Sequence, residues 1–368
     1  MLGRLPIGLT GLAILLLVQT ASESFAKGGA AAACYVVGLS VIAPALGRGI
    51  DRYGPRRILL ASGLLFPSAL LALVAAVSHG AAALTLLFAA AAGASFPPIT
   101  VCVRTYFRRQ LQNDPLLAVA YSAESVLIEM IFIVGPVLVA VFVAYASAAA
   151  AVWFAAACAF VGTLVFLRSP ALREWHIEAR TTAGLLGPLA ERRFPALVAV
   201  VLCFAASFGF VEIGVAAYAA EAGNPAFAGV LLGIMSAGSA LGGLTYGGRS
   251  WHFPLGRQFA VALLVLSAGL AVLALRWTPW SFAAWCAVAG IAMAPGLIIQ
   301  SMLAASIARA EHATEAFTWT TSALLAGVGI GLAGGGLLLE NFPSQAALAA
   351  SAATALIAAA GARLLLGR

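Results

Sequence analysis

The chain has 368 residues, of which 63% are hydrophobic and only 9% are charged. A soluble globular domain is about half apolar and about a quarter charged, so this composition leaves too little polar surface for a water-soluble fold and predicts an integral membrane protein. The formal net charge is +7, but the basic residues lie in short gaps between apolar runs, which argues against the basic face of a nucleic-acid-binding protein.

Apolar runs in chain order predict twelve membrane-spanning helices. Crossing about 30 Å of hydrocarbon takes roughly 20 apolar residues in a helix. We therefore expect an all-α polytopic membrane protein in which short gaps join antiparallel neighbours. The predicted spans are residues 5–25, 28–48, 56–77, 81–105, 117–145, 147–167, 194–219, 226–248, 257–275, 280–307, 315–339 and 345–365.

The basic residues also predict the orientation of these spans. With the N-terminus placed inside, all but two of the 20 Lys and Arg residues fall on the inner side, the exceptions being Lys27 and Arg276. Cytoplasmic loops carry such an excess of positive charge, so we expect both termini in the cytoplasm. A single Lys beside abundant Arg, Ala and Gly is typical of a GC-rich genome, and we expect the inner membrane of a bacterial cell.

Internal similarity predicts two halves of six helices each. Pro6 and Pro195 open the first and seventh runs after an Arg, at an offset of about 189 residues, while Gly93 and Gly290 each precede a proline by five residues, at an offset of about 197. Parallel repeats of this kind form substrate sites between the halves. We expect an N-terminal bundle over residues 1–168, a polar cytoplasmic linker over 169–193 and a C-terminal bundle over 194–368.

The stretch GRGIDRYGPRR concentrates charge in the gap between the second and third predicted helices. Its single acid, Asp51, lies among four arginines and can hold nearby Arg side chains or face the positive N-terminus of a helix. We expect this stretch to latch the halves together at the inner face, the alternative being that its arginines anchor the loop to anionic lipid. The latch residues would be Gly47, Asp51, Arg52, Gly54, Arg56 and Arg57.

This pattern, Gly-x-x-x-Asp-Arg-x-Gly-x-Arg-Arg, resembles motif A of the major facilitator superfamily, with Gly49 and Pro55 as departures. The resemblance implies two six-helix bundles that rock about a central cavity lined by the first, fourth, seventh and tenth helices. Gly135 and Pro136 resemble motif C of the antiporters in that superfamily. The stretch that ends at Gly93 lacks the arginine that such antiporters often carry there, which counts against proton-coupled efflux.

Acids inside predicted spans are candidates for function, because charge in lipid is expensive. Glu129 lies near the middle of the fifth helix, where it is a candidate proton or cation site or a structural carboxyl. Glu23 and Glu212 share the offset of 189 and are expected at equivalent places near the outer mouth, either as coupling or gating acids or as hydrated side chains. Glu124 lies at the depth of Arg104, and we expect a structural ion pair between them.

Polar residues on the four cavity helices give weaker candidates, each of which could instead bond a neighbouring helix. These candidates are Gln19, Thr100, Ser207 and Gln300. The sequence contains no phosphate-binding loop, nucleophile elbow or metal-ligand spacing, so we expect neither an enzyme nor a cofactor or metal.

Together these features predict a monomeric secondary active transporter in the lipid bilayer. Its expected activity is proton-coupled efflux of an apolar or amphipathic small molecule by alternating access. The alternatives are an uptake symporter or uniporter for a small polar solute and, from a different class, a non-transporting membrane sensor.

Overall fold

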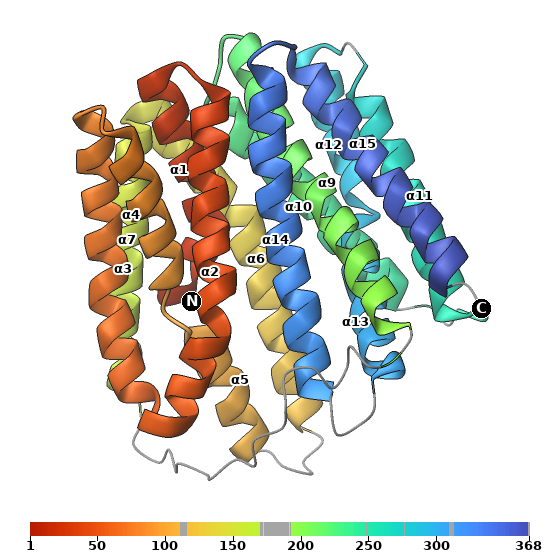
Figure 1. Cartoon of the computed structure of the whole chain (residues 1–368), viewed down its shortest axis with the longest axis horizontal. Helices are drawn as coiled ribbons and strands as arrows, with labels where there is room; N and C mark the ends of the chain where they lie inside the picture. The colour runs from red at the N-terminus through yellow and green to blue at the C-terminus, as the bar shows by residue number, and fades with distance from the viewer. Residues whose placement is uncertain are drawn as a thin grey trace.

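The computed structural model describes residues 1–110, 116–169, 172, 191, 193–247, 249, 251–275, 277–308 and 313–366, and within some described helices it leaves individual side chains undescribed. Every secondary-structure element in these ranges is a helix (Figure 1). The buried apolar side chains form a main cluster that draws on both halves of the chain. The predicted all-α membrane architecture is therefore confirmed.

The first half of the chain forms one bundle of long helices. It begins with a short 3₁₀ turn, and its fourth crossing is divided into two helices. Its elements are η1 (Leu2–Arg4), α1 (Pro6–Ser22), α2 (Phe25–Tyr53), α3 (Pro55–Ser78), α4 (Ala82–Ala94), α5 (Ile99–Gln110), α6 (Leu116–Tyr145) and α7 (Ala148–Leu167).

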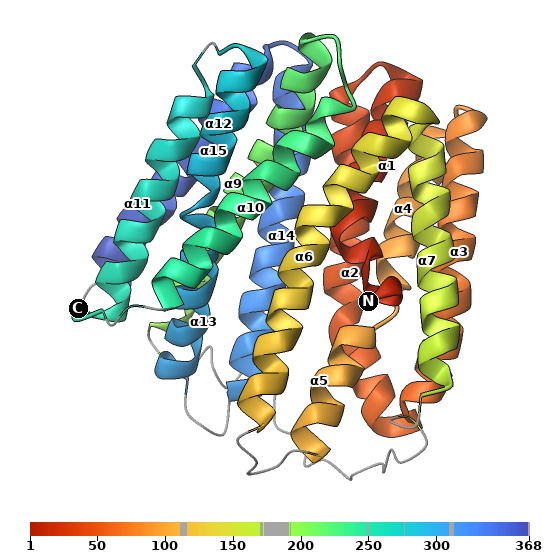
Figure 2. The same ribbon diagram turned by 180° about the vertical axis from the view of Figure 1, so that it is seen from behind.

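The second half forms a matching bundle in which the tenth crossing is divided. Its elements are α9 (Phe194–Glu221), α10 (Phe227–Gly247), α11 (Leu255–Leu273), α12 (Pro279–Gly290), α13 (Met293–Ile307), α14 (Ala313–Leu339), α15 (Ser344–Gly361) and η4 (Ala362–Leu366). Figure 2, seen from behind, shows the two bundles side by side with α6 next to α10.

The described helices make twelve crossings when each divided crossing is counted once. In the part of the chain that the structure describes, ten segments are long and apolar enough to span a membrane, and α1 and the second part of α6 are shorter apolar helices. The fourth crossing breaks at Pro97 and Pro98, because proline has no backbone N–H to continue the helix. The predicted count of twelve agrees with this topology.

The two halves repeat the same helix packing through glycines. Gly38 of α2 lies against the carbonyl of Ala90 in α4, and Gly238 of α10 lies against the carbonyl of Ala287 in α12. A side chain at either glycine would approach the carbonyl oxygen more closely than real Cβ atoms do. The second and fourth crossings therefore meet in the same way as the eighth and tenth, as the predicted repeat requires.

Glycine contacts also correct the predicted alignment of the first and seventh crossings. Gly8 of α1 lies against the carbonyl of Ile131 in α6, and Gly209 of α9 lies against the carbonyl of Val328 in α14. The equivalent of Gly8 is thus Gly209, an offset of about 201 rather than 189. The helix-opening prolines misled the alignment because α9 has 28 residues and α1 only 17. Figure 1 shows the N-terminus well above the lower end of α2.

This alignment overturns the prediction that Glu23 and Glu212 occupy equivalent places. At an offset of 201 the counterpart of Glu212 is Gly11, and the counterpart of Glu23 is Asn224 in the turn after α9. Glu23 is the exposed C-cap of α1 with a left-handed φ of 53°. Glu212 lies inside α9, more than two turns before its end.

The charged stretch GRGIDRYGPRR is mostly helical, which corrects its assignment to a gap. Helix α2 continues to Tyr53, and α3 begins at Pro55. Only Gly54 interrupts them, with a φ of 80° that a residue with a side chain rarely adopts. The chain therefore turns at Gly54, whereas Gly47 lies inside α2 and a Cβ there would meet no atom within 4 Å.

Candidate functional site at the junction of the two halves

Among the described residues, four main pairs of helices join the halves: α2 with α14, α6 with α10, α1 with α9 and α2 with α9. We call the side with the α2–α3 and α10–α11 turns the arginine-rich face, which lies at the bottom of Figure 1. The opposite side, with the α1–α2, α3–α4 and α14–α15 turns, is called the far face. These names describe the sequence positions of the basic residues and imply no orientation in a cell.

Close backbone contacts join the halves near the far face. Gly29 of α2 lies against the carbonyl of Leu332, and Gly229 of α10 lies against the carbonyl of Pro136 in α6. A Cβ at Gly336 of α14 would lie 2.7 Å from the carbonyl oxygen of Phe25. All these contacts fall in the far-face half of each helix. Small residues allow such approach between membrane helices, so the far face is closed.

Toward the arginine-rich face, α2 and α10 no longer make these close contacts with the other half. Val41 of α2 is 65% exposed and Leu244 of α10 is 70% exposed. A Cβ at Gly247 would meet no atom within 4 Å. The lower parts of the divided crossings, α5 and α13, pack mainly within their own halves in the described part of the chain. The described contacts thus join the halves at the far face and spread them at the arginine-rich face.

Glu212 lies at the centre of this junction. Within its own half, α9 packs against α14, α15, α10 and α13, and α1 packs against α2, α6, α7 and α3. The remaining side of each helix, on which α1 meets α9, therefore faces the other half. A Cβ at Gly11 of α1 would lie 3.8 Å from Glu212 Oε1. No hydrogen bond from the described residues reaches this carboxylate, which stays partly exposed. Because Gly11 is the repeat counterpart of position 212, the two residues face each other across the pseudo-two-fold axis.

The other two acid candidates have different surroundings. Glu23 is exposed at the far face, just past the end of α1. Glu129 lies near the middle of the 30-residue helix α6, as predicted, but its side chain is outside the described residues. Position 129 is four residues before Ile133, whose carbonyl faces Gly233 of α10. Helical periodicity therefore places position 129 on the strip of α6 that faces α10.

Gly135 and Pro136, the residues that resemble motif C, form part of the junction. A Cβ at Gly135 would lie 2.6 Å from the backbone of Gly8 in α1, and the carbonyl of Pro136 faces Gly229 of the other half. The pair thus brings α1, α6 and α10 together on the far-face side. These contacts pack the three helices against one another.

The four polar cavity candidates are dispersed rather than gathered in one site. Ser207 is fully buried, donates to the carbonyl of Phe204, and accepts at its own carbonyl from Ser351 of α15, so it does not face the other half here. Gln19 lies against Gly28 of α2 near the far face. Thr100 Oγ1 and Gln300 Oε1 are buried and have no hydrogen-bond partner in the described part of the chain.

The predicted latch and the predicted ion pair remain predictions. The side chains of Asp51 and Arg52, and those of Arg104 and Glu124, lie outside the described residues. Arg56 and Arg57, the two remaining latch arginines, project from the start of α3 and are exposed. The latch stretch forms the α2–α3 turn of the arginine-rich face.

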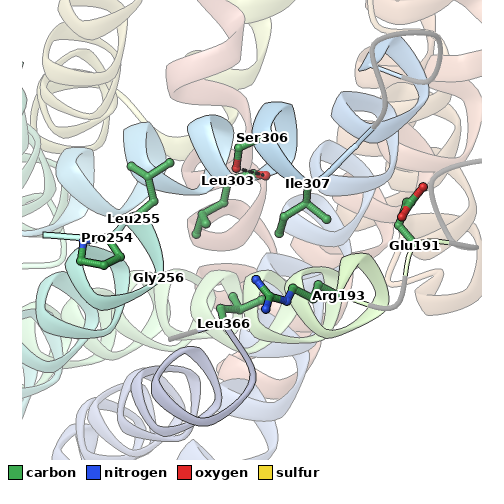
Figure 3. Close-up of a pocket in the computed structure, with 9 residues that line it drawn as sticks. All are labelled: Glu191, Arg193, Pro254, Leu255, Gly256, Leu303, Ser306, Ile307 and Leu366. Carbon is green, nitrogen blue, oxygen red and sulfur yellow. Dashed lines mark hydrogen bonds between the residues drawn. The ribbon is translucent and has the colours of Figure 1, made fainter. Parts of the chain in front are cut away.

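A pocket of about 530 Å³ lies within the second half at the arginine-rich face. Figure 3 shows Arg193 extending across it between Leu366 and the α13 residues Leu303 and Ile307, while Glu191 lies at the edge. The start of α11 forms the opposite wall. Because its lining comes from one half, this pocket is not part of the junction.

Sequence reasoning missed the glycines that close the junction, chiefly Gly29, Gly229 and Gly336. The GxxxG spacing of Gly229 and Gly233 is a signal for close helix packing that could have found one of them. No group of His, Cys, Asp and Glu that could hold a metal ion is found among the described residues.

The structure is similar to that of a single-substitution variant of the nucleoside transporter NupG, with a TM-score of 0.80 and 14% identity over 99% of this chain and 98% of that one. It is also similar to a bacterial homologue of the iron transporter ferroportin in an inward-facing state, with a TM-score of 0.74 and 12% identity over 100% and 96% of the chains. A peptide transporter, POT, gives a TM-score of 0.66 and 15% identity over 98% and 90%.

At these identities the structural likeness shows the fold alone. No curated protein matches the sequence. The family model of the Major Facilitator Superfamily matches residues 2–223, which is more than half of the chain. The chain, a multi-pass membrane protein with twelve crossings in two repeated bundles, therefore belongs to the Major Facilitator Superfamily of transporters.

Proposed function

We propose that the protein exports an apolar or amphipathic small molecule in exchange for protons, and that Glu212 is the carboxyl through which protons are coupled to transport. The observation that carries the proposal is the position of Glu212 between the halves, beside Gly11 and without a hydrogen-bond partner among the described residues. A carboxyl inside a membrane-spanning helix can take up or release a proton when the path to one face opens.

The surroundings of Glu212 support an apolar or amphipathic substrate. The residues one helical turn away on α9 are Phe208, Gly209, Val215 and Ala216, none of which has a polar side chain. Gly11 leaves open space on the facing helix, because a Cβ there would meet only Glu212 Oε1 within 4 Å. A compound in this space would meet apolar surface and a single carboxyl. Glu129 is a second coupling candidate on the α6 strip that faces α10.

The orientation we propose places the arginine-rich face, and with it both termini, in the cytoplasm of a bacterial cell. In the sequence, all but two of the 20 Lys and Arg residues fall in segments that the predicted topology assigns to that side, as the positive-inside rule expects. The described conformation, closed at the far face, is then inward-facing. Protonation of Glu212 would remove its charge and make it easier to enclose between the halves.

Uptake or uniport of a small polar solute is the second candidate. It is favoured by Thr100 Oγ1 and Gln300 Oε1, which are buried without a partner in the described part of the chain. Such groups could be satisfied by a hydroxyl or amide of a solute. They lie on α5 and α13, the lower parts of the two divided crossings.

Purified protein in liposomes with an internal pH dye tests the proposal. Wild-type protein should move protons when a gradient of an amphipathic compound is imposed, Glu212→Gln should abolish this movement, and Glu212→Asp should restore part of it. The Asp variant keeps the titrating group and moves it by one methylene, so it controls for packing. Undiminished solute-driven proton movement in Glu212→Gln would remove this residue from the mechanism, and solute movement without protons would favour uniport.

A further inference from the structure

The far face carries a polar contact that crosses between the halves. Ser24 Oγ donates a hydrogen bond of 2.6 Å to Glu340 Oε1. Ser24 is the N-cap of α2 in the first half, and Glu340 directly follows α14 in the second half. We propose that this pair is a gating contact that holds the far face closed and must break before substrate can pass there.

The serine hydroxyl links the contact to the start of α2. Ser24 Oγ also accepts a hydrogen bond of 3.2 Å from the backbone N–H of Lys27. A hydroxyl has one donor and two acceptor positions, so both bonds form at once. The Lys27 amide, the hydroxyl and the Glu340 carboxylate make a short chain in which each bond polarises the next. The closed state therefore holds the carboxylate more firmly than an isolated surface hydrogen bond would.

Helix ends make the contact specific to the closed state. Glu340 lies at the C-terminal, negative end of its own helix α14, where a carboxylate is unfavourable. The contact with Ser24 brings it to the N-terminal, positive end of α2, where a carboxylate is favourable. When the far face opens, Glu340 leaves the N-terminal end of α2 but stays at the C-terminal end of α14. The electrostatic gain is thus present only when the halves meet.

Backbone packing holds the two helix ends in place. A Cβ at Gly336 would lie 2.7 Å from the carbonyl oxygen of Phe25 and 2.9 Å from Ala26 Cα. Gly336 is one turn before Glu340 on α14, and Phe25 directly follows Ser24. The same two helix ends therefore meet through backbone and through side chains. This arrangement involves neither the substrate nor protons, so the inference does not depend on the proposed coupling.

Two substitutions of Ser24 and one double variant separate gating from helix capping. Asp and Asn both cap helices well, but Asp places a second carboxylate against Glu340, whereas Asn offers an amide donor. Ser24→Asp should open the far face, Ser24→Asn should retain closure, and Ser24→Asp combined with Glu340→Gln should restore it. Ser147 is the matched control, because it caps α7 at the same face through Ala150 N–H at 3.1 Å and is exposed.

The experiment measures the distance between two spin labels at the far face by double electron–electron resonance, with the protein in nanodiscs and without substrate. The labels replace His79, at the end of α3, and Asn224, after α9, in a cysteine-free background. Ser24→Asp should raise the population with the long distance about tenfold, the order expected for loss of one charge-assisted hydrogen bond. Ser147→Asp and Ser24→Asn should match the wild type.

The proposal would be overturned by either of two results. Ser24→Asp and Ser147→Asp could give the same distance distribution, or Glu340→Gln could fail to restore closure to Ser24→Asp. Because the readout needs no transport, a failure here leaves proton coupling at Glu212 untouched, and a failure of coupling leaves this contact untouched.

Discussion

Substitution of Gly336 by alanine tests whether the close contact of α2 with α14 holds the far face closed. The new Cβ would lie 2.7 Å from the carbonyl oxygen of Phe25 and 2.9 Å from Ala26 Cα, whereas ordinary contact begins at 3.4 Å. The helices would have to separate by about 0.5–0.7 Å at this point, because both atoms belong to the backbone and cannot rotate away. When the far face is open (the far-open state), these two helix ends are apart, so the strain is present only in the closed state.

Overpacking of this kind destabilises by about 1–3 kcal/mol. Since about 1.4 kcal/mol is a factor of ten, the far-open population should rise roughly fivefold to 150-fold. The same spin-label distance between positions 79 and 224 measures it. Gly329→Ala is the matched control, because its Cβ would lie at an ordinary 3.7 Å from the carbonyl oxygen of Ala33, two turns earlier on α14. Identical distance distributions for the two variants would refute the reasoning.

Three further predictions concern single contacts. Gly93→Ala, which drives a Cβ into a carbonyl of α2 within the first half, should lower the melting temperature in detergent, whereas Gly47→Ala, which meets no atom within 4 Å, should not. Glu221→Gln should also lower the melting temperature, by an amount that corresponds to about 1–2 kcal/mol, because Glu221 accepts from Ser344 N–H at 2.7 Å and Oγ at 2.6 Å and so caps α15. Asp51→Asn should shift the protein toward the state open at the arginine-rich face if the latch exists, and an unchanged distance between labels at that face would exclude the latch.

The sequence was sufficient to predict the architecture, because lipid imposes a strong rule on it. A helix that crosses hydrocarbon needs about 20 apolar residues, and this requirement alone yields the twelve crossings. Glycines that precede prolines, Gly93 and Gly290, also indicated the repeat correctly. Their role in packing the second crossing on the fourth, and the eighth on the tenth, is visible only in the structure.

Register and helix ends were harder to predict. The prolines that open α1 and α9 look equivalent in sequence, but packing aligns Gly8 with Gly209. This shift separates Glu212 from Glu23 and pairs it with Gly11, a relation that depends on how two helices from different halves meet. The charged stretch was assigned to a gap because it is polar, yet its glycine at position 47 stays helical and the chain turns only at Gly54.

The candidate site was predicted only in part, because it also depends on helix register and on where the helices end. An acid inside a span is visible in sequence as a candidate, and Glu212 was found this way. The contact of Ser24 with Glu340 was not, because both residues lie at helix ends where polar side chains are ordinary. Only their meeting across the two halves distinguishes them.

The most direct test of the account is the labelling of a cysteine at Gly11, the position that faces Glu212, in a background without native cysteines. Membrane-impermeant maleimide should react with Gly11→Cys from the arginine-rich face and not from the far face, and the added substitution Ser24→Asp should make it reactive from the far face. Labelling of Gly11→Cys from the far face alone, or from neither side in both backgrounds, would contradict a path between the halves that opens at one face at a time.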